Sequence, residues 1–433
     1  MFGTSGIRGL YGSELDEKLA LLVSNIFADN VVAVGRDIRK TGKPIAHAIF
    51  AGITSAGMDG IDIGIAPTPT VAFATKIRRI KGIMITASHN PPQYNGLKFF
   101  KDGIEIGRNA EREIEERYRR CETRLADWNK IGRLIKDDSF IAKHKDSVKS
   151  LVNIQKNKRV RVVIDSNGAG VVITPQLFRE FGCDVISIND SIEGFSRPSE
   201  PNAKNLEGLS KKVIESGADF GIAHDGDADR CVIIDEHGEI VPFDVQLSIM
   251  IEHELERTRN KRIVSTIESS LIVREAVEKS GGELIVTPVG SSYVGEALER
   301  YNAIFGGEPC GEYIYQNGVH VPDGVLSAAK FLEIYLEKGR FSELKKKYKT
   351  YPIYRDKFHA QDRNGTIKRI KAQLRTEGRI NEEDGVRVDE DDGWFLIRPS
   401  GTEPLIRLTM EYKDKDKLER KRAELVELIK KNL

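Results

Sequence analysis

Hydrophobic and polar residues follow one pattern three times along the chain. Each copy begins with a β-branched strand-like run, continues through a helix-like stretch, and reaches glycine before a second strand-like run. Glycine ends such helices readily because it adopts the left-handed conformation without steric cost. The strand-like runs are residues 31–34 and 61–63, 160–164 and 185–188, and 263–267 and 284–286. The helix-like stretches between them are residues 44–56, 177–180 and 273–277.

The three copies start at residues 31, 160 and 263, too far apart for the units of a solenoid. Strands that alternate with helices favour mixed or parallel sheets covered by helices on both faces. We therefore expect three related mixed-sheet α/β domains followed by a smaller α+β domain. The expected bounds are residues 1–140, 150–242, 243–350 and 351–433.

The pattern changes after about residue 351, where the strand-like stretches 393–397 and 405–409 alternate between apolar and polar positions. From Asp414 onward, apolar residues recur near helical spacing among Lys, Arg and Glu, which predicts an amphipathic helix docked on a sheet. The apolar positions of this helix are Leu418, Leu425, Val426, Ile429 and Leu433. A basic helix that touches nucleic acid is the alternative, and we consider it the weaker one.

Composition narrows the functional classes. The 433 residues carry 67 Lys and Arg against 66 Asp and Glu, so no global field attracts nucleic acid or membrane, and any phosphate recognition must be local. The four cysteines are far apart, which suggests neither a zinc site nor a disulfide framework. The opening residues lack the features of a signal peptide, and no long uncharged apolar run follows. We expect a cytoplasmic protein with no nucleic-acid or membrane partner.

An acidic loop, residues 225–230, is the sharpest local feature. It carries carboxylates at alternate positions, Asp225, Asp227 and Asp229, between two strand-like runs. Such carboxylates can converge on one Mg²⁺ or Ca²⁺ ion, because these cations prefer oxygen ligands. An EF-hand is disfavoured because Arg230 stands where that loop needs glycine and because strands flank it. A solvated acidic turn without metal is the remaining alternative.

Three further loops offer chemistry. Ser88 lies in a turn-forming segment, residues 86–92, after an apolar run, and is a candidate nucleophile, although Ser-His alone is a weak signal. Residues 398–404 combine Arg with small residues that can expose backbone N–H groups to a phosphate, although a plain hairpin turn is also compatible. Residues 306–312 form a glycine-bracketed acidic loop whose carboxylates could accept hydrogen bonds from sugar hydroxyls.

Together these four loops, in this order, resemble those of the α-D-phosphohexomutases, which move a phosphoryl group between the 1- and 6-positions of hexoses. The resemblance spans nearly the whole chain, and it includes the opening residues 2–9, the turn 35–37 and residues 287–290. It implies one central cleft, a phosphosugar substrate, Mg²⁺ as cofactor and a hexose 1,6-bisphosphate as activator. Homodimerisation is left open.

The resemblance also implies roles for individual residues. Ser88 matches the phosphoserine that donates and accepts the phosphoryl group, and it would complete the Mg²⁺ shell of Asp225, Asp227 and Asp229. Arg8 and Lys98 match basic positions beside the reacting group, with Lys98 as general acid/base. The residues expected to bind substrate are Arg230, His89, Glu308, Cys310, Gly311, Arg398, Ser400, Gly401, Thr402 and Arg407. Phosphoryl transfer depends mainly on positioning and charge stabilisation, which suits this set.

The sugar loop departs from the family pattern G-E-x-S-G-H. Cys310 replaces a hydroxyl and Glu312 replaces an imidazole, and His320 is a candidate to substitute for that imidazole. Within the family, the opening residues and the segment 289–294 are more similar to phosphoglucosamine mutases, with phosphomannomutase/phosphoglucomutase as the alternative. Two other functional classes are left open. A phosphatase would use the same metal- and phosphate-binding residues, whereas a non-catalytic phosphosugar- or calcium-binding protein would keep the anion-binding loop but would not need Ser88.

Overall fold

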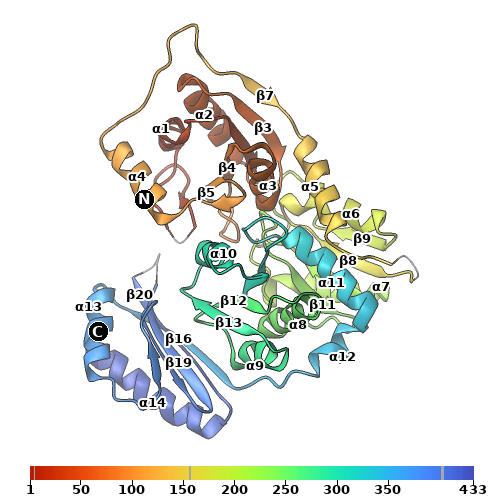
Figure 1. The fold of residues 1–433 in the computed structure, drawn as a ribbon, viewed down its shortest axis with the longest axis vertical. Coiled ribbons are helices and arrows are strands. Elements are labelled where there is room, and N and C mark those ends of the chain that lie inside the picture. The colour runs from red at the N-terminus through yellow and green to blue at the C-terminus, as the bar shows by residue number, and fades with distance from the viewer. Residues whose placement is uncertain (4, 156–157, 401–403) are drawn as a thin grey trace.

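The structure, a computed structural model, describes residues 1–3, 5–155, 158–400 and 404–433. Its elements build four sheets in succession, three of them mixed and flanked by helices, the fourth antiparallel (Figure 1). This confirms the predicted fold class. None of the helices in the described ranges combines the length and apolar character needed to cross a bilayer.

The first sheet has the order β1-β5-β4-β2-β3-β7, with β6 paired to β5. Its strands are β1 (Ile7–Leu10), β2 (Val32–Arg36), β3 (Gly60–Ile65), β4 (Lys81–Ile85), β5 (Tyr94–Lys101), β6 (Ile104–Glu105) and β7 (Leu134–Lys136). The helices of this part are α1 (Glu17–Phe27), α2 (Gly42–Ser55), α3 (Thr68–Arg78), α4 (Arg108–Arg119) and α5 (Ser139–Ser150). Strand β4 is parallel to β2, but β5 returns antiparallel to β4, so the connecting loop with Ser88 lies at the carboxyl end of β4.

The second and third sheets share a plan, with orders β11-β10-β8-β9 and β13-β12-β14-β15. In each, parallel strands are followed by one antiparallel hairpin, β10–β11 or β14–β15, whose turn carries an acidic loop. The strands are β8 (Arg161–Asp165), β9 (Asp184–Ile188), β10 (Phe220–Ala223), β11 (Val232–Asp235), β12 (Arg262–Thr266), β13 (Glu283–Thr287), β14 (Phe305–Glu308) and β15 (Glu312–Tyr315). The α-helices are α6 (Thr174–Glu180), α7 (Glu207–Ser216), α8 (Phe243–Glu256), α9 (Leu271–Lys279), α10 (Ser291–Arg300), α11 (Gly324–Lys338) and α12 (Phe341–Lys345).

The fourth sheet is antiparallel, in the order β16-β20-β19-β18-β17. Its elements are β16 (Ile353–His359), α13 (Arg363–Gln373), β17 (Arg379–Asn381), β18 (Val386–Glu390), β19 (Gly393–Pro399), β20 (Leu405–Tyr412) and α14 (Lys415–Asn432). Asp414 caps the N-terminus of α14 by accepting the N–H of Lys417, and the helix packs Leu418, Leu425 and Ile429 on the sheet. The expected apolar contact of Leu433 is wrong, because this residue follows the last turn and is 51% exposed.

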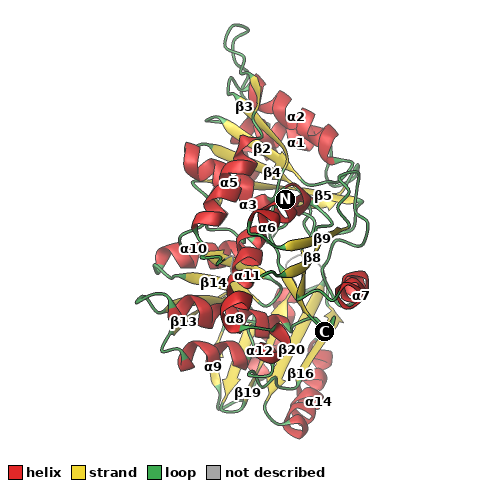
Figure 2. Ribbon diagram, turned by 90° about the vertical axis from the view of Figure 1, so that its right-hand side faces the viewer, coloured by secondary structure: helices red, strands yellow, loops and turns green. Residues whose placement is uncertain are grey.

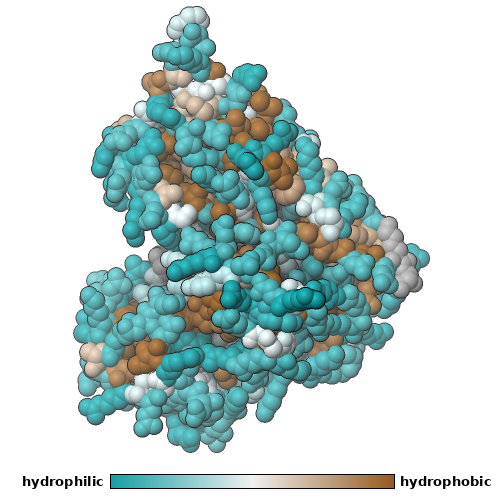
Figure 3. All heavy atoms as spheres, viewed as in Figure 1, coloured by the Kyte–Doolittle hydropathy of each residue, from teal (hydrophilic) through white to brown (hydrophobic). Residues whose placement is uncertain are grey.

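Hydrophobic cores tie the sheets together unequally. One core runs through the second and third sheets, whereas the first and fourth sheets have cores of their own. A small cluster of Ile267, Leu271, Trp394 and Leu396 joins the third sheet to the fourth. Helices flank the first three sheets, whereas α13 and α14 pack on one face of the fourth sheet (Figure 2). The surface is hollowed between the N-terminal and C-terminal sheets (Figure 3).

Candidate active site

Ser88 lies almost fully buried, at 1% exposure, in the loop after β4. Its backbone is left-handed, with φ of +49°, a conformation that non-glycine residues adopt rarely and mostly where the surroundings impose it. The N–H of Ser88 donates to Thr86 Oγ1 at 2.8 Å, and Thr86 Oγ1 donates to Asp37 Oδ2 at 2.7 Å. The hydroxyl of Ser88 therefore projects from a loop whose backbone is fixed from behind.

Arg39 holds the same loop from the other side. Its guanidinium donates to the carbonyl oxygens of Ser88 (2.9 Å), Asn90 (2.8 Å), Pro91 (2.6 Å) and Tyr94 (2.9 Å). Its Nε also pairs with Asp37 at 3.0 Å. Sequence reasoning missed Arg39, because the acceptors are backbone carbonyls that no side-chain pattern reveals.

The acidic loop of the second sheet meets Ser88 directly. Ser88 Oγ donates to Asp225 Oδ2 at 2.6 Å, and Ser199 Oγ donates to the Ser88 carbonyl at 2.9 Å. Gly226 permits this approach, since a Cβ at that position would stand 2.6 Å from the Ser88 carbonyl oxygen. The loops of the first and second sheets thus form one continuous surface.

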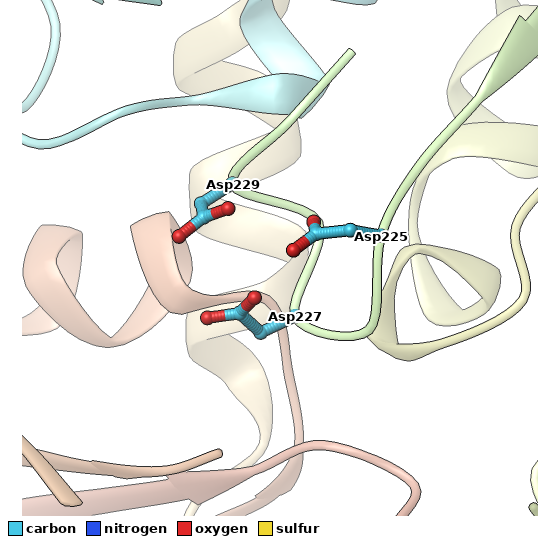
Figure 4. A group of neighbouring side chains, drawn as sticks. All are labelled: Asp225, Asp227 and Asp229. Carbon is cyan, nitrogen blue, oxygen red and sulfur yellow. The ribbon is translucent and has the colours of Figure 1, made fainter. Parts of the chain in front are cut away.

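The three aspartates point into one common space (Figure 4). Asp225, Asp227 and Asp229 are buried, and each offers a ligand oxygen within 4.8 Å of the others. Strands β10 and β11 flank the loop, which contradicts an EF-hand, whose loop lies between helices. Within the described residues, Oδ1 of Asp227 and of Asp229 is buried without a hydrogen-bond partner. Buried carboxylate oxygens that face one another without donors fit a hard divalent cation.

The pKa values of the three aspartates are shifted because their negative charges lie close together. Burial, followed by repulsion from Asp229 and Asp227, raises the pKa of Asp225 well above its ordinary value. Burial and the charge of Asp227 raise the pKa of Asp229 to about 6. Burial also acts to raise the pKa of Asp227, but Lys98 and the hydroxyl of Thr68 outweigh it and hold that pKa below its ordinary value. A divalent cation would relieve this repulsion.

Cationic side chains surround the aspartates. Lys98 Nζ, on β5, lies 2.9 Å from Asp227 Oδ2 and 2.7 Å from Asp229 Oδ2. Burial acts to lower the pKa of Lys98, but the two carboxylates more than compensate and raise it, so the side chain is cationic. Arg8, on β1, donates to Asn90 Oδ1 at 3.4 Å, and its buried Nε has no partner among the described residues.

His89 lies beside Ser88, with Nδ1 3.4 Å from Ser88 Oγ. The charge of Arg230, together with burial and the charge of Arg8, lowers the pKa of His89 to about 2. The imidazole is therefore neutral near pH 7 and can donate or accept a hydrogen bond.

The sugar loop is the tight turn of the hairpin β14–β15. Glu308 Oε2 accepts the N–H of Gly290 at 3.2 Å, and Glu312 Oε1 pairs with Arg230 Nη2 at 2.8 Å. Gly311 has φ of +91°, and a Cβ there would meet the Cys231 carbonyl oxygen at 2.8 Å. His320 is not among the residues that line the cleft, since its Nε2 lies 3.2 Å from the Gln316 carbonyl instead. The suggested substitution by His320 is therefore wrong, and Glu312 occupies the cleft.

The candidate phosphate-binding loop of the fourth sheet, residues 398–404, is called the phosphate loop here, and the two adjacent strands that it joins carry cations. Arg398 on β19 and Arg407 on β20 are opposite each other in register. Arg398 pairs with Asp384 at 3.0 Å and lies 3.6 Å from Glu268. Ser400 donates its N–H to the Leu405 carbonyl at 2.8 Å. Gly401 and Thr402 lie outside the described residues.

One cleft of about 720 Å³ connects the four sheets. It is lined by Arg8, His89 and Lys98 from the first sheet, Asp229 and Arg230 from the second, Glu308, Cys310 and Glu312 from the third, and Arg398, Ser400 and Arg407 from the fourth. Ser88, Asp225 and Asp227 lie beneath its floor, in contact with these residues. Arg355, on β16, lines the cleft as well, although no motif in the sequence marks it.

Comparisons with known proteins place these features in context. Four sequence models described as phosphoglucomutase/phosphomannomutase match the chain in succession. They are alpha/beta/alpha domain I at residues 1–124, domain II at 138–238, domain III at 243–351, and the C-terminal domain at 342–428.

Whole proteins show the same likeness. A protein of Methanococcoides burtonii named probable phosphoglucosamine mutase is 40% identical over 422 residues, which is 96% of this chain and 95% of the relative. A Thermococcus kodakarensis protein named phosphoglucomutase/phosphomannomutase is 37% identical, over 96% of this chain and 95% of its own. The crystal structure of a phosphoglucomutase/phosphomannomutase family protein from Burkholderia thailandensis matches with a TM-score of 0.89 at 24% identity, covering 99% of this chain and 97% of that one.

Proposed function

The chain belongs to the phosphoglucomutase/phosphomannomutase family and is an enzyme of the phosphohexomutase class, and we propose that it interconverts hexose 6-phosphate and 1-phosphate through a phosphoserine at Ser88. The observation that carries this proposal is the contact of Ser88 Oγ with Asp225, at 2.6 Å, beneath a cleft lined by cations of the first, second and fourth sheets and by carboxylates of the third. If Ser88 carries the phosphoryl group, the reaction needs no external nucleotide as phosphoryl donor.

Two transfers complete the proposed reaction. In the first, a hydroxyl oxygen of the hexose phosphate attacks the phosphorus on Ser88. The new P–O bond to the sugar forms as the bond to Ser88 Oγ breaks, and the hydroxyl proton leaves the sugar while the serine oxygen regains one. The product is a 1,6-bisphosphate. After it turns over in the cleft, the other phosphoryl group returns to Ser88 and leaves the isomeric monophosphate.

The residues of the reacting end stabilise charge and geometry during both transfers. Arg39 and Thr86 fix the loop of Ser88, while Arg8 and Lys98 provide positive charge beside the transferring group. Lys98, cationic in this arrangement, is proposed as the group that exchanges protons with the reacting oxygens. Mg²⁺, held by Asp225, Asp227, Asp229 and Ser88, would supply further positive charge for the phosphoryl group.

The distant phosphate is proposed to bind Arg398, Ser400, Gly401, Thr402 and Arg407. A guanidinium offers paired donors that match phosphate oxygens, and this remote grip orients the reacting end of the sugar. A free hexose 1,6-bisphosphate would act as activator by charging Ser88.

Glucosamine is the proposed hexose. The 40% identical relative is named probable phosphoglucosamine mutase, whereas phosphomannomutase/phosphoglucomutase activity, as named for the 37% identical relative, is the second candidate.

The test is turnover of glucosamine, glucose and mannose 1-phosphates, each with its 1,6-bisphosphate, by the wild type and by Ser88→Ala. We expect the 6-phosphate as product with little free phosphate, and a loss of about 10³-fold or more in the variant, which should still bind the sugar phosphates. Dominant release of phosphate would indicate a phosphatase. Undiminished turnover in Ser88→Ala would refute the phosphoserine mechanism.

A further inference from the structure

Two glutamates stand opposite each other in the middle of the cleft. Glu308 and Glu312 are register partners on the antiparallel strands β14 and β15, and both line the cleft. They are only 6% and 9% exposed. Like charges at directly opposite positions of a sheet destabilise it, so the fold alone gives no reason for this pair.

The protein only partly neutralises these carboxylates. Arg230 engages one oxygen of Glu312, with Nη2 at 2.8 Å and Nε at 3.0 Å from Oε1. The N–H of Gly290 engages one oxygen of Glu308, Oε2. Across the described ranges, no other hydrogen-bond donor reaches the remaining oxygen of either side chain. One guanidinium therefore faces two carboxyl groups. Burial, followed by the charge of Glu312, raises the pKa of Glu308 well above its ordinary value, and a cation placed between the two groups would relieve this crowding.

A third polar group beside the pair also lacks a partner. Thr266 ends β12, which runs parallel to β14 with Ser265 paired to Gly307, so Thr266 and Glu308 are neighbours at the same sheet edge. Thr266 lines the cleft, is 2% exposed, and its Oγ1 has no hydrogen-bond partner among the described residues. A buried hydroxyl without a partner points to a polar ligand group at this place.

The order of charges along the cleft is positive, negative, positive. On one side, Arg230 pairs with Glu312. On the other side, Glu308 accepts the N–H of Gly290, and the neighbouring N–H of Val289 donates to Asp384. Asp384 in turn pairs with Arg398. The carboxylates thus lie between the cations of the reacting end and those of the phosphate loop. A hexosamine bisphosphate presents the complementary order of phosphate, ammonium, phosphate, whereas a neutral hexose bisphosphate has no positive group between its phosphates.

We propose that Glu308 and Glu312, with Thr266, form an ammonium-binding subsite that makes the enzyme favour hexosamine phosphates over neutral hexose phosphates. Glu312 is the specificity-determining member, since it places the second carboxylate in the cleft. An ammonium group donates up to three hydrogen bonds and separates the two negative charges. This inference rests on the phosphohexomutase function proposed above.

The experiment compares kcat/KM for glucosamine 1-phosphate and glucose 1-phosphate, each with its own 1,6-bisphosphate, in the wild type and in Glu312→Gln. Glutamine keeps the size and a carbonyl acceptor but removes the charge. We expect both values to fall, with the glucosamine value falling about tenfold further, because a charge-assisted hydrogen bond is lost. Glu200→Gln is the matched control: Glu200 is an exposed carboxylate at the same cleft, outside the pair, and its removal should leave the substrate ratio unchanged.

An equal fall for both substrates in Glu312→Gln would overturn the proposal, because Glu312 would then act only by holding Arg230. Should that variant fail to fold, the wild-type ratio measured against pH replaces it. The preference for glucosamine must disappear as the amine loses its proton, and a ratio that does not change would overturn the proposal equally. A wild type with no mutase activity on any hexose phosphate would instead refute the proposed function, which keeps the two failures distinct.

Discussion

The two ends of the cleft are built in different ways. At the end where we propose that the reaction takes place, called the reacting end, Ser88, Asp225 and Asp227 are nearly inaccessible, and hydrogen bonds from the first and second sheets fix them. At the far end, Arg398 and Arg407 belong to a sheet with its own core, which the small cluster around Trp394 joins to the third sheet. Glu411 adds to that junction by accepting from Ser270, Leu271 and Trp394.

This difference follows from what each end is proposed to do. A group that makes and breaks bonds must be held within fractions of an ångström, so dense fixation at Ser88 supports turnover. A loop that binds the distant phosphate must release the bisphosphate so that it can reorient in the cleft. Such a loop therefore depends on positive charge more than on a rigid geometry. Changes at the reacting end should therefore act on kcat, and changes at the far end on KM.

Removing one charge from the proposed metal-binding carboxylates should have the largest effect. Asp227→Asn leaves the shape of the loop but lowers the charge facing Mg²⁺, and we expect kcat/KM to fall by about 10³-fold or more. The measurement is turnover as a function of Mg²⁺ concentration. Asp190→Asn, at an exposed position of the same part of the chain, is the control and should behave like the wild type. A loss of similar size in this control would show that the effect is not specific to the site.

Arg39→Lys tests whether fixation of the loop matters as such. Lysine keeps the charge but cannot donate to four carbonyl oxygens, so the Ser88 loop should lose its preferred geometry. We expect kcat to fall by about 10- to 100-fold with little change in KM, since hydrogen bonds to charged groups contribute about 1.5–3 kcal/mol each. Steady-state kinetics at several substrate concentrations separate the two constants. A rise in KM with normal kcat would contradict the comparison between the two ends.

The sequence predicted much of this arrangement. The features that it did not predict depend on backbone acceptors or on contacts between residues far apart in the chain. The β-branched runs at 31–34, 160–164 and 263–267 overlap β2, β8 and β12 to within a residue or two, because apolar runs of that length suit buried strands. Arg39 was beyond reach because it binds backbone carbonyls, which every residue possesses. The role of Glu312 depends on a register pair and an ion pair between two sheets, and such long-range contacts leave no local signature.

Arg398→Lys probes the far end. Lysine replaces a planar fork by a point charge, so the grip on the distant phosphate weakens while the reacting end is untouched. We expect KM to rise about tenfold and kcat to change less than about threefold. Arg355→Lys, an exposed cation at the same end, should shift KM less. If kcat fell and KM did not, the far end would take part in the chemistry, and the contrast drawn here would be wrong.

Glu105→Gln should change activity least of these variants, because the residue does not line the cleft. The variant instead measures how the burial of a carboxyl group behind the reacting end affects the free energy of unfolding. Glu105 accepts from Ser5 Oγ at 3.0 and 3.1 Å, and burial raises its pKa from 4.5 to about 7 although Lys98 opposes the shift. The folded protein therefore holds this proton more tightly than the unfolded chain does. Its contribution to the free energy of unfolding is fully present below pH 4.5 and declines as the pH rises to about 7.

The expected decline from this one carboxyl is on the order of 1–3 kcal/mol, since each unit of pKa shift corresponds to about 1.4 kcal/mol. Urea denaturation at pH 5 and pH 8 measures it as the difference between wild type and Glu105→Gln. The amide cannot ionise but can still accept from Ser5, so the variant should lose less stability than the wild type between these pH values. An equal loss in both proteins would mean that other groups dominate the pH dependence and that Glu105 is ionised in the folded state without penalty.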